Sequence, residues 1–328
     1  MNYKPILIAA GEPNSVFLEL FFKVISKKKI KSPIILIASK KILELQMKKF
    51  NFYKKIKLLD NKLLKKYDLN NKTINLINID YMQSKTFEKI SKKSNGYIKD
   101  SFKIAFKILK AGITNKFING PISKKNYLGK KFLGITEYVS KKFSTDKTAM
   151  LIYNQKLSVC PITTHLPIKM VSKKINKKNI TEKVYLINSF YKKKFGFKPK
   201  MAILGLNPHC ESVDKYNEDE KIIKPLVKDL LKKKYKISGP HSADTIFLKN
   251  NRRKYDVIIG MYHDQVLTPL KTLYEYDAIN ITLGLPFIRI SPDHGPNEKM
   301  LGKNVSNPLS LLKSITFLDK NWLKLKKV

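Results

Sequence analysis

Short apolar runs alternate with longer amphipathic stretches along the whole chain. Eight of these runs are five or six residues long and rich in isoleucine, leucine and alanine, as buried strands are. They are residues 6–10, 34–38, 73–78, 149–153, 158–163, 201–206, 256–261 and 279–283. Because helix-length segments separate them, the pattern is typical of an α/β protein with a largely parallel sheet.

Apolar spacing between these runs predicts helices. The first covers residues 99–110, where apolar side chains recur every three or four positions and share one face. A second is expected to start near Thr181 and to run towards Lys194, because a threonine followed by an acidic residue is a common helix start. A third covers residues 218–234 and has a similar apolar stripe.

The chain is long enough to bury a large core. Its 328 residues, 43% of them hydrophobic, correspond to about two compact lobes. No internal repeat, low-complexity linker or glycine-serine spacer divides them, so we expect the lobes to be closely integrated. The first is predicted to comprise residues 1–130 plus 296–328, and the second residues 131–295.

Several features favour the cytoplasm and exclude a membrane partner. The longest apolar runs, such as 33–38 and 256–262, are far shorter than the roughly 18 to 20 residues that cross a bilayer. The apolar stretch 5–10 is too short and too soon interrupted for a signal peptide. Cys160 and Cys210 are too few for a disulfide framework.

The formal charge of +41 first indicates a nucleic-acid-binding protein. Two observations oppose that interpretation. Arginine, the preferred residue for forked phosphate contacts, occurs only at Arg252, Arg253 and Arg289. The lysines are spread over almost every predicted helix and are enriched together with asparagine, isoleucine, tyrosine and phenylalanine, which share AT-rich codons. Compositional drift explains the charge more simply, so no nucleic-acid partner is expected, although a positive field would attract anionic substrates.

All five histidines lie between His165 and His294, and three of them share one relation to the strands. His165, His209 and His263 each follow a predicted strand by a few residues. In open parallel sheets the loops at the carboxyl ends of strands form the ligand crevice. Three imidazoles there, with coordination positions left open, are typical of a catalytic divalent-metal site. The alternative is that each is an ordinary loop histidine with its own hydrogen bonds.

Six segments carry a resemblance to a known family. They are NGPISK (119–124), TTHLPIK (163–169), GLNPHCE (205–211), ADTIF (243–247), GMYHDQVLTPLK (260–271) and NITLGLPFIRISPDHG (280–295). In order and spacing they resemble the signatures of the 4-hydroxythreonine-4-phosphate dehydrogenases over nearly the whole chain. The resemblance implies the fold of the isocitrate and isopropylmalate dehydrogenase superfamily, with two α/β/α lobes and the active site in the cleft between them.

The resemblance also implies roles for particular residues. His165, His209 and His263 match the ligands of a divalent metal, such as Zn, Mg or Co, at a site shared across a homodimer. Four further positions match residues that contact the phosphorylated substrate, namely Thr136, Lys271, Asn280 and Arg289. Asp244 matches an acidic residue near the reacting centre, and Lys271 is also a candidate for proton transfer. A structural ion pair is the alternative for Arg289.

The cofactor implied by the resemblance is NAD or NADP. No G-x-G-x-x-G motif follows a strand, so the ordinary dinucleotide fingerprint is absent. Residues 293–308 resemble the nicotinamide-cofactor loop of the isocitrate and isopropylmalate dehydrogenases, with His294, Gly295 and Asn307 as candidate contacts. A solvated loop is the alternative.

The implied activity is the oxidation and decarboxylation of 4-phosphooxy-L-threonine to 3-amino-2-oxopropyl phosphate, a step in pyridoxal 5′-phosphate (vitamin B6) biosynthesis. Three departures from the family pattern bear on the substrate. Ile135 stands where the family has a histidine, the opening loop 11–20 lacks its usual glycines, and Pro296 replaces a small hydroxyl residue. The alternatives are therefore a dehydrogenase of another phosphorylated hydroxy acid, such as 4-phosphoerythronate, and a lysine-rich nucleic-acid-binding protein on a decayed enzyme scaffold.

Overall fold

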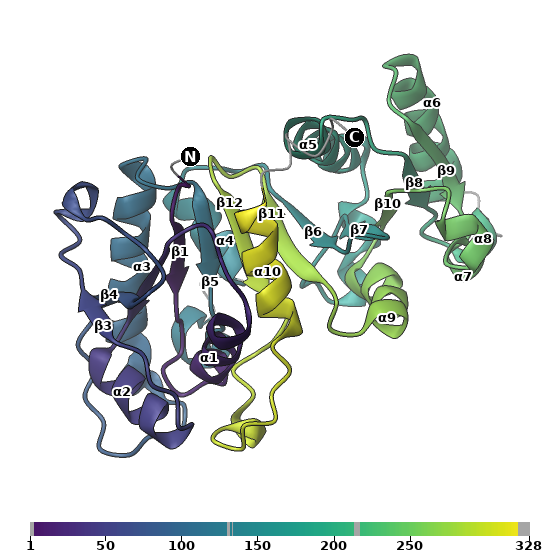
Figure 1. The fold of residues 1–328 in the computed structure, drawn as a ribbon. Coiled ribbons are helices and arrows are strands. Elements are labelled where there is room, and N and C mark those ends of the chain that lie inside the picture. Colours follow the sequence, from purple (N-terminus) through teal and green to yellow (C-terminus); the bar gives the residue numbers. More distant parts are fainter. Residues whose placement is uncertain (1–2, 130–131, 133, 213–216, 321–328) are drawn as a thin grey trace. The chain divides into compact units, whose positions relative to one another are not determined.

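The chain forms two compact units. A computed structural model describes residues 3–129, 132, 134–212 and 217–320. Unit 1 contains the described residues up to Val139 together with Pro286–Lys320, and unit 2 contains those of Ser140–Leu285 (Figure 1). Each unit combines strands and helices. The predicted α/β class with a largely parallel sheet is therefore confirmed.

The strands of unit 1 are all parallel and lie in the order β3-β4-β2-β1-β5-β12. Their bounds are β1 Ile6–Ala9, β2 Ile34–Ala38, β3 Ile56–Leu58, β4 Ile74–Asn78, β5 Lys116–Asn119 and β12 Ile288–Pro292. Every residue of β1 and β2 is buried. This burial explains their continuous apolar sequences, because a central parallel strand is covered on both faces.

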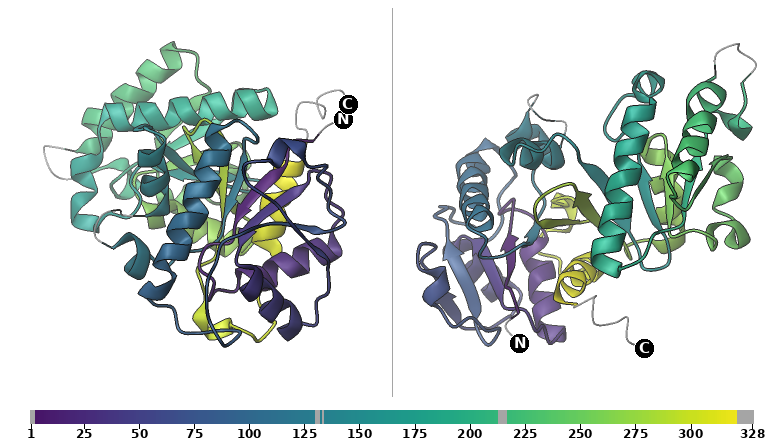
Figure 2. Two further views of the ribbon diagram at one scale, coloured as in Figure 1. Left: turned by 90° about the vertical axis from the view of Figure 1, so that its left-hand side faces the viewer. Right: turned by 90° about the horizontal axis from the view of Figure 1, so that it is seen from above.

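Helices cover both faces of this sheet. Their bounds are α1 Phe17–Lys27, α2 Lys40–Lys49, α3 Asn95–Lys110, α4 Ile135–Lys142, which crosses the unit boundary, and α10 Leu309–Asp319. Helices α1 and α10 pack together on one face, and α3 packs on the other (Figure 2). This layering follows from the parallel pairing, since each parallel connection must cross over the sheet.

The strands of unit 2 lie in the order β11-β6-β7-β10-β8-β9. Their bounds are β6 Ala149–Tyr153, β7 Ser158–Pro161, β8 Met201–Leu204, β9 Ile237–His241, β10 Val257–Gly260 and β11 Ile279–Leu283. The β11/β6 and β6/β7 pairs are antiparallel, whereas β7, β10, β8 and β9 are parallel neighbours. The helices are α5 Lys177–Phe195, α6 Lys224–Lys232, α7 Ala243–Ile246, α8 Lys249–Arg252 and α9 His263–Tyr274.

All eight predicted strands are present, and four strands were not predicted. The missed ones are β3, β5, β9 and β12. They are short or contain glycine, proline or charged residues, which weaken the local strand signal. Helix α5 begins at Lys177 rather than near Thr181, because the Asn176 side chain accepts a hydrogen bond from the Asn179 N–H (2.9 Å) and caps it. None of the helices in the described ranges has the length and apolarity needed to cross a membrane.

Candidate functional site

Three adjacent parallel strands place the predicted metal ligands at one edge of unit 2. Strand β10 pairs with β7 on one side and with β8 on the other. His165 follows β7, His209 follows β8 and His263 follows β10. Because the carboxyl ends of parallel neighbours share an edge, the three histidine loops are neighbours despite their separation in sequence.

The rings of His165 and His263 lie close together. Their centroids are 6.0 Å apart and their planes meet at 37°. A metal bound at about 2.0–2.1 Å from a ring nitrogen lies roughly 3.2 Å from the ring centroid, so two rings that share one ion have centroids at most about 6.4 Å apart. At a tetrahedral angle the same geometry gives about 5.2 Å, so the two imidazoles are close to the spacing of rings that share one cation and slightly wider than it.

Asp264 extends this pair, and the sequence analysis did not single it out. Its Oδ1 lies 2.6 Å from Nδ1 of His263, the first residue of α9. A carboxylate bonded to one ring nitrogen fixes the orientation of a histidine and directs the other nitrogen to a metal. The His-Asp dipeptide within the GMYHDQ segment was the available signal.

His209 occupies a tight, left-handed turn and is not joined to this pair. Its φ is 55°, a conformation that non-glycine residues adopt rarely. The buried carboxylate of Asp219 supports the turn by accepting hydrogen bonds from the backbone N–H groups of Leu206 (2.8 Å) and Asn207 (3.1 Å). The described part of a single chain holds no group of three His, Cys, Asp or Glu side chains placed to share a metal. One chain therefore brings two of the three predicted ligands together.

The other predicted residues of unit 2 differ in burial. Lys271 is half-buried near the end of α9, and burial lowers the pKa of its ammonium group. Asn280 lies on β11, and its buried Oδ1 has no hydrogen-bond partner among the described residues. Asp244 is exposed on α7. His241 bonds through Nε2 to Oγ of Ser238 (2.8 Å).

Arg289 is the centre of a buried network in unit 1. It is fully buried on β12 and donates three hydrogen bonds through its three nitrogens. Nε donates to Oδ1 of Asn119 (2.8 Å), Nη1 to Oγ1 of Thr136 (3.0 Å) and Nη2 to Oγ of Ser291 (2.9 Å). These three acceptors are neutral.

Burial also affects the charge of this arginine. It lowers the pKa of Arg289 to about 10, against the opposing effect of the Glu137 carboxylate, and the side chain stays cationic at neutral pH. Thr136 and Ile135 are only half-buried. Thr136 and Ser291 are thus the accessible partners in the network, and direct contact of Arg289 with a substrate requires its neighbours to move.

Residues 293–308, called the cofactor loop below, follow β12. The ring of His294 stacks on Phe17 with centroids 6.3 Å apart, and its Nδ1 bonds to the Gly295 carbonyl oxygen (3.1 Å). Burial lowers the pKa of His294, and its buried Nε2 has no partner among the described residues. An orphaned imidazole nitrogen fits a hydrogen-bond donor on a bound ligand. Asn307 instead caps α10, since its Oδ1 accepts from the Leu309 N–H (2.9 Å).

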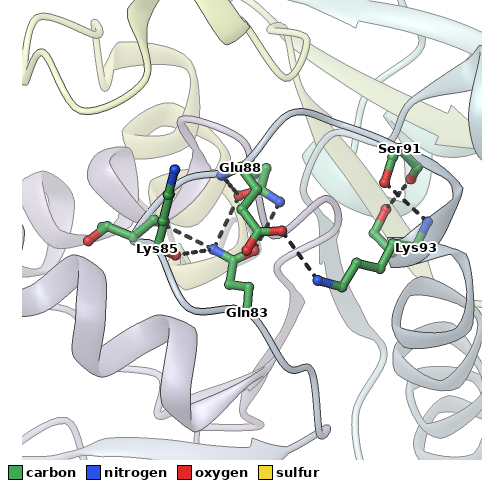
Figure 3. Close-up of polar contacts among 8 residues, drawn as sticks. Gln83, Lys85, Glu88, Ser91 and Lys93 are labelled. Atoms are coloured by element: carbon green, nitrogen blue, oxygen red, sulfur yellow. Dashed lines mark hydrogen bonds and ion pairs between the residues drawn. The ribbon is translucent and has the colours of Figure 1, made fainter.

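The opening loop between β1 and α1 lies beside the segment that follows β4. Gly11 has a φ of 79°, and a Cβ there would collide with the carbonyl oxygen of Pro121, so glycine is required at this one position. Asn14 and Gln83 exchange two side-chain hydrogen bonds of 3.1 and 3.3 Å. Figure 3 shows Gln83 within the polar contacts of its segment, which include the Lys93–Glu88 ion pair (3.3 Å).

Glu12 is a buried carboxylate in this loop, and its replacement by glutamine is expected to stabilise the protein at neutral and alkaline pH. Burial raises its pKa above the ordinary 4.5, against the hydrogen bond from Ser94 (2.8 Å) and that from the Asn14 N–H. Stability is therefore fully present below the ordinary pKa and is lost as pH rises through the raised value. Glutamine removes the charge: its Oε1 can accept from the Asn14 N–H, and its Nε2 can donate to Oγ of Ser94, whose hydroxyl then donates to the Ser91 carbonyl oxygen (3.1 Å).

Urea unfolding of wild type and Glu12→Gln checks this effect. The variant should have the higher midpoint at about pH 8, and the difference should disappear near pH 4. A midpoint difference that stays constant between these conditions would show that ionisation of Glu12 is not its cause.

Two surface cavities lie away from all of these residues. One, of about 470 Å³, is lined by residues of α1 and of the amino-terminal ends of β2 and β4, including Ile25, Ile34 and Asn75. The other, of about 670 Å³, lies between α5 and the segment around α6 and includes Tyr185 and Leu230. Neither of these two cavities is lined by a predicted site residue.

The fold and the paired imidazoles define a parallel α/β protein with a candidate metal site at the carboxyl edge of a sheet. The model of one family, the pyridoxal phosphate biosynthetic protein PdxA, matches residues 29–318. The chain belongs to this family.

Proteins named 4-hydroxythreonine-4-phosphate dehydrogenase are similar over almost the full length. The one from Sulfurihydrogenibium sp. (strain YO3AOP1) is 37% identical, covering 94% of this chain and 96% of its own. The one from Aquifex aeolicus (strain VF5) is 33% identical, covering 96% and 98%. Solved structures under the same name agree in fold. The Klebsiella pneumoniae structure has a TM-score of 0.82 at 25% identity, covering 96% and 97% of the two chains. The Burkholderia phymatum structure has a TM-score of 0.78 at 26% identity, covering 97% and 98%.

Proposed function

We propose that this chain is a cytoplasmic 4-hydroxythreonine-4-phosphate dehydrogenase of pyridoxal 5′-phosphate biosynthesis. It oxidises and decarboxylates 4-phosphooxy-L-threonine to 3-amino-2-oxopropyl phosphate with NAD or NADP. The observation that carries the proposal is the His165–His263 pair at the carboxyl edge of unit 2, in a chain whose relatives bear the name of this reaction.

A divalent cation, such as Zn, Mg or Co, would be held by His165 and His263, with Asp264 orienting the second ring. The third ligand in the proposal is His209 of a second subunit in a homodimer. The separation of His209 from the other two within the described part of one chain supports this arrangement. Two identical sites per dimer follow from the symmetry of such an exchange.

The bound cation and the nicotinamide would supply Lewis-acid stabilisation of negative charge and a hydride acceptor. The protein's own residues bind and orient the substrate. Thr136 offers its hydroxyl to the phosphate while the buried Arg289 supplies positive charge behind it, and Asn280 accepts a hydrogen bond through its orphaned Oδ1. Lys271, whose pKa burial lowers, is suited to proton transfer, and Asp244 is the acidic residue proposed for the reacting centre.

The cofactor contacts proposed are His294, Gly295 and Asn307. The orphaned Nε2 of His294 supports the first of them. At Gly295 an added Cβ would meet no atom within 4 Å, so the chain itself leaves space there for a ligand. Asn307 keeps its side-chain amide nitrogen for such a contact, because Oδ1 is the atom that caps α10.

A second candidate substrate is 4-phosphoerythronate, and Ile135 is the observation that favours it. Ile135 is the half-buried first residue of α4 and lacks the hydrogen-bonding ring found at this position in the family. An apolar side chain beside Thr136 removes one polar contact to the substrate, and such a contact is worth about 1–3 kcal/mol when buried.

A substrate panel tests the proposal. Purified protein with NAD or NADP and Zn, Mg or Co is expected to reduce the nicotinamide and release carbon dioxide with 4-phosphooxy-L-threonine. The variant Ile135→His should lower the KM for this substrate by about tenfold, since it restores a polar contact of that size. Full activity on 4-phosphoerythronate, with none on the threonine phosphate, would exclude the first substrate.

A further inference from the structure

An ion pair of unit 1, formed by Lys23 and Glu19, binds the backbone of the cofactor loop. Nζ of Lys23, on α1, donates to Oε1 of Glu19 (2.8 Å) and to the carbonyl oxygens of Asn304 (2.9 Å) and Ser306 (2.9 Å). An ammonium group has three N–H donors, so these three contacts use all of them. The lysine therefore holds the loop at two backbone positions that lie 281 and 283 residues further along the chain.

Glu19 also binds the loop directly, through the backbone of Ser306. Its side chain is 2% exposed, and the oxygen that accepts from Lys23 also accepts from the Ser306 N–H (2.8 Å). Both backbone polar groups of Ser306 are thus bound to the same ion pair. Two other i,i+4 ion pairs among the described residues are far more exposed: the side chains of Lys40 and Glu44, 3.6 Å apart, are 45% and 53% exposed, and those of Lys224 and Glu220 are 46% and 48% exposed.

The start of α1 holds the other end of the same loop. The Val16 N–H donates to the Pro296 carbonyl oxygen (3.1 Å), and Phe17 stacks on His294. Helix α1 also packs beside α10, into which the loop leads (Figure 1). Residues 297–299 and 303–305, between these anchors, are exposed. One helix therefore sets the positions of both loop ends.

We propose that Lys23, paired with Glu19, is a positioning residue for the nicotinamide cofactor. It fixes the loop conformation next to Asn307 in the free protein. Binding of the cofactor then loses less conformational entropy of the loop. The inference rests on the proposed function, because it assumes that residues 293–308 contact the cofactor. No direct contact of Lys23 with substrate or cofactor is required.

The test compares the full-length variants Lys23→Met and Lys40→Met. The Kd for NADH and NADPH should rise about tenfold in Lys23→Met, because the loop must then be ordered when the cofactor binds. The KM for 4-phosphooxy-L-threonine should stay unchanged, and Lys40→Met should resemble wild type. Hydrogen exchange of the amides in 303–307 should accelerate in Lys23→Met alone.

A double variant separates the loss of loop positioning from a general loss of stability. Lys23→Met leaves the Glu19 carboxylate buried without its cation, which destabilises a protein. The double variant Glu19→Gln/Lys23→Met removes both charges, keeps an acceptor for the Ser306 N–H and still lacks the grip on the two carbonyl oxygens. It should show the same rise in Kd at near wild-type stability.

The outcomes separate the inference from the proposed function. Faster loop exchange with unchanged Kd for both nucleotides in the double variant would overturn the positioning role while the enzyme assignment stands. An equal rise in the KM for 4-phosphooxy-L-threonine would overturn the positioning role as well, because the substitution would then weaken substrate and cofactor binding alike. Wild-type protein that binds neither NADH nor NADPH would overturn both.

Discussion

Replacement of His263 by alanine is expected to remove the bound divalent metal and to lower kcat/KM by about three orders of magnitude. A metal that stabilises developing charge contributes several kcal/mol to the transition state, and each 1.36 kcal/mol is about a factor of ten in rate. The rings of His263 and His165 are 6.0 Å apart, and His263 lies outside the buried core, with its side chain one-third exposed. Metal content and steady-state kinetics measure the effect.

Asp264→Asn serves as the graded control. It weakens the contact to Nδ1 of His263 without removing the ring, so metal affinity or activity should fall by about 10- to 100-fold. Wild-type metal content and kcat/KM in His263→Ala would contradict the metal assignment.

Mixing inactive subunits tests where the third ligand comes from. When His209→Ala and His263→Ala subunits are co-expressed, a hybrid dimer with exchanged ligands has one intact site and one doubly defective site. Half of the dimers are hybrids at equal mixing, so about a quarter of the wild-type activity should return. Co-expression of His165→Ala and His263→Ala subunits should restore no activity. In the proposal one subunit supplies both of these ligands to a site, so each site of the hybrid dimer lacks one of them. Restoration in neither mixture would place all three ligands in one subunit.

Replacement of Arg289 by methionine is expected to lower the free energy of unfolding by roughly 3–5 kcal/mol and to raise the KM for the phosphorylated substrate. The fully buried guanidinium would no longer donate to Thr136 and Ser291, and Asn119 Oδ1 would keep only the hydrogen bond from the Ser291 hydroxyl (3.0 Å). Each buried group left without a partner costs about 1–3 kcal/mol. Urea unfolding and steady-state kinetics give the two effects.

Arg252→Met is the matched control for this prediction. Arg252 lies on α8, is half-buried and donates one hydrogen bond, to the Phe247 carbonyl oxygen (2.7 Å). Its loss should change the free energy of unfolding by no more than about 1 kcal/mol. Arg289→Lys separates charge from geometry, because lysine keeps the charge but not the planar fork. A stable Arg289→Met protein with unchanged KM would exclude both roles of the network.

Local pattern was sufficient for eight of the twelve strands in the described ranges and for the histidine loops. The apolar runs that form β1, β2 and β10 are continuous because both faces of those strands are buried. His165, His209 and His263 follow such runs, and parallel pairing then brings the strand ends to one edge. The short strands β5 and β12 lack this signal, since their neighbours in the sheet, rather than their own composition, make them strands.

Contacts between distant segments required the tertiary structure. Arg289 was a candidate from its segment alone, but its partners Asn119 and Thr136 lie 170 and 153 residues away. The contact between Lys23 and the cofactor loop also joins segments far apart in the sequence, and only the tertiary structure shows it. The separation of His209 from the other two histidines was likewise visible only in the structure. The amino-acid sequence by itself determined the family, eight of the strands and the position of three histidines just after strands, because these depend on local periodicity and residue type. Which side chains meet there was decided by packing, because it depends on how whole elements lie against one another.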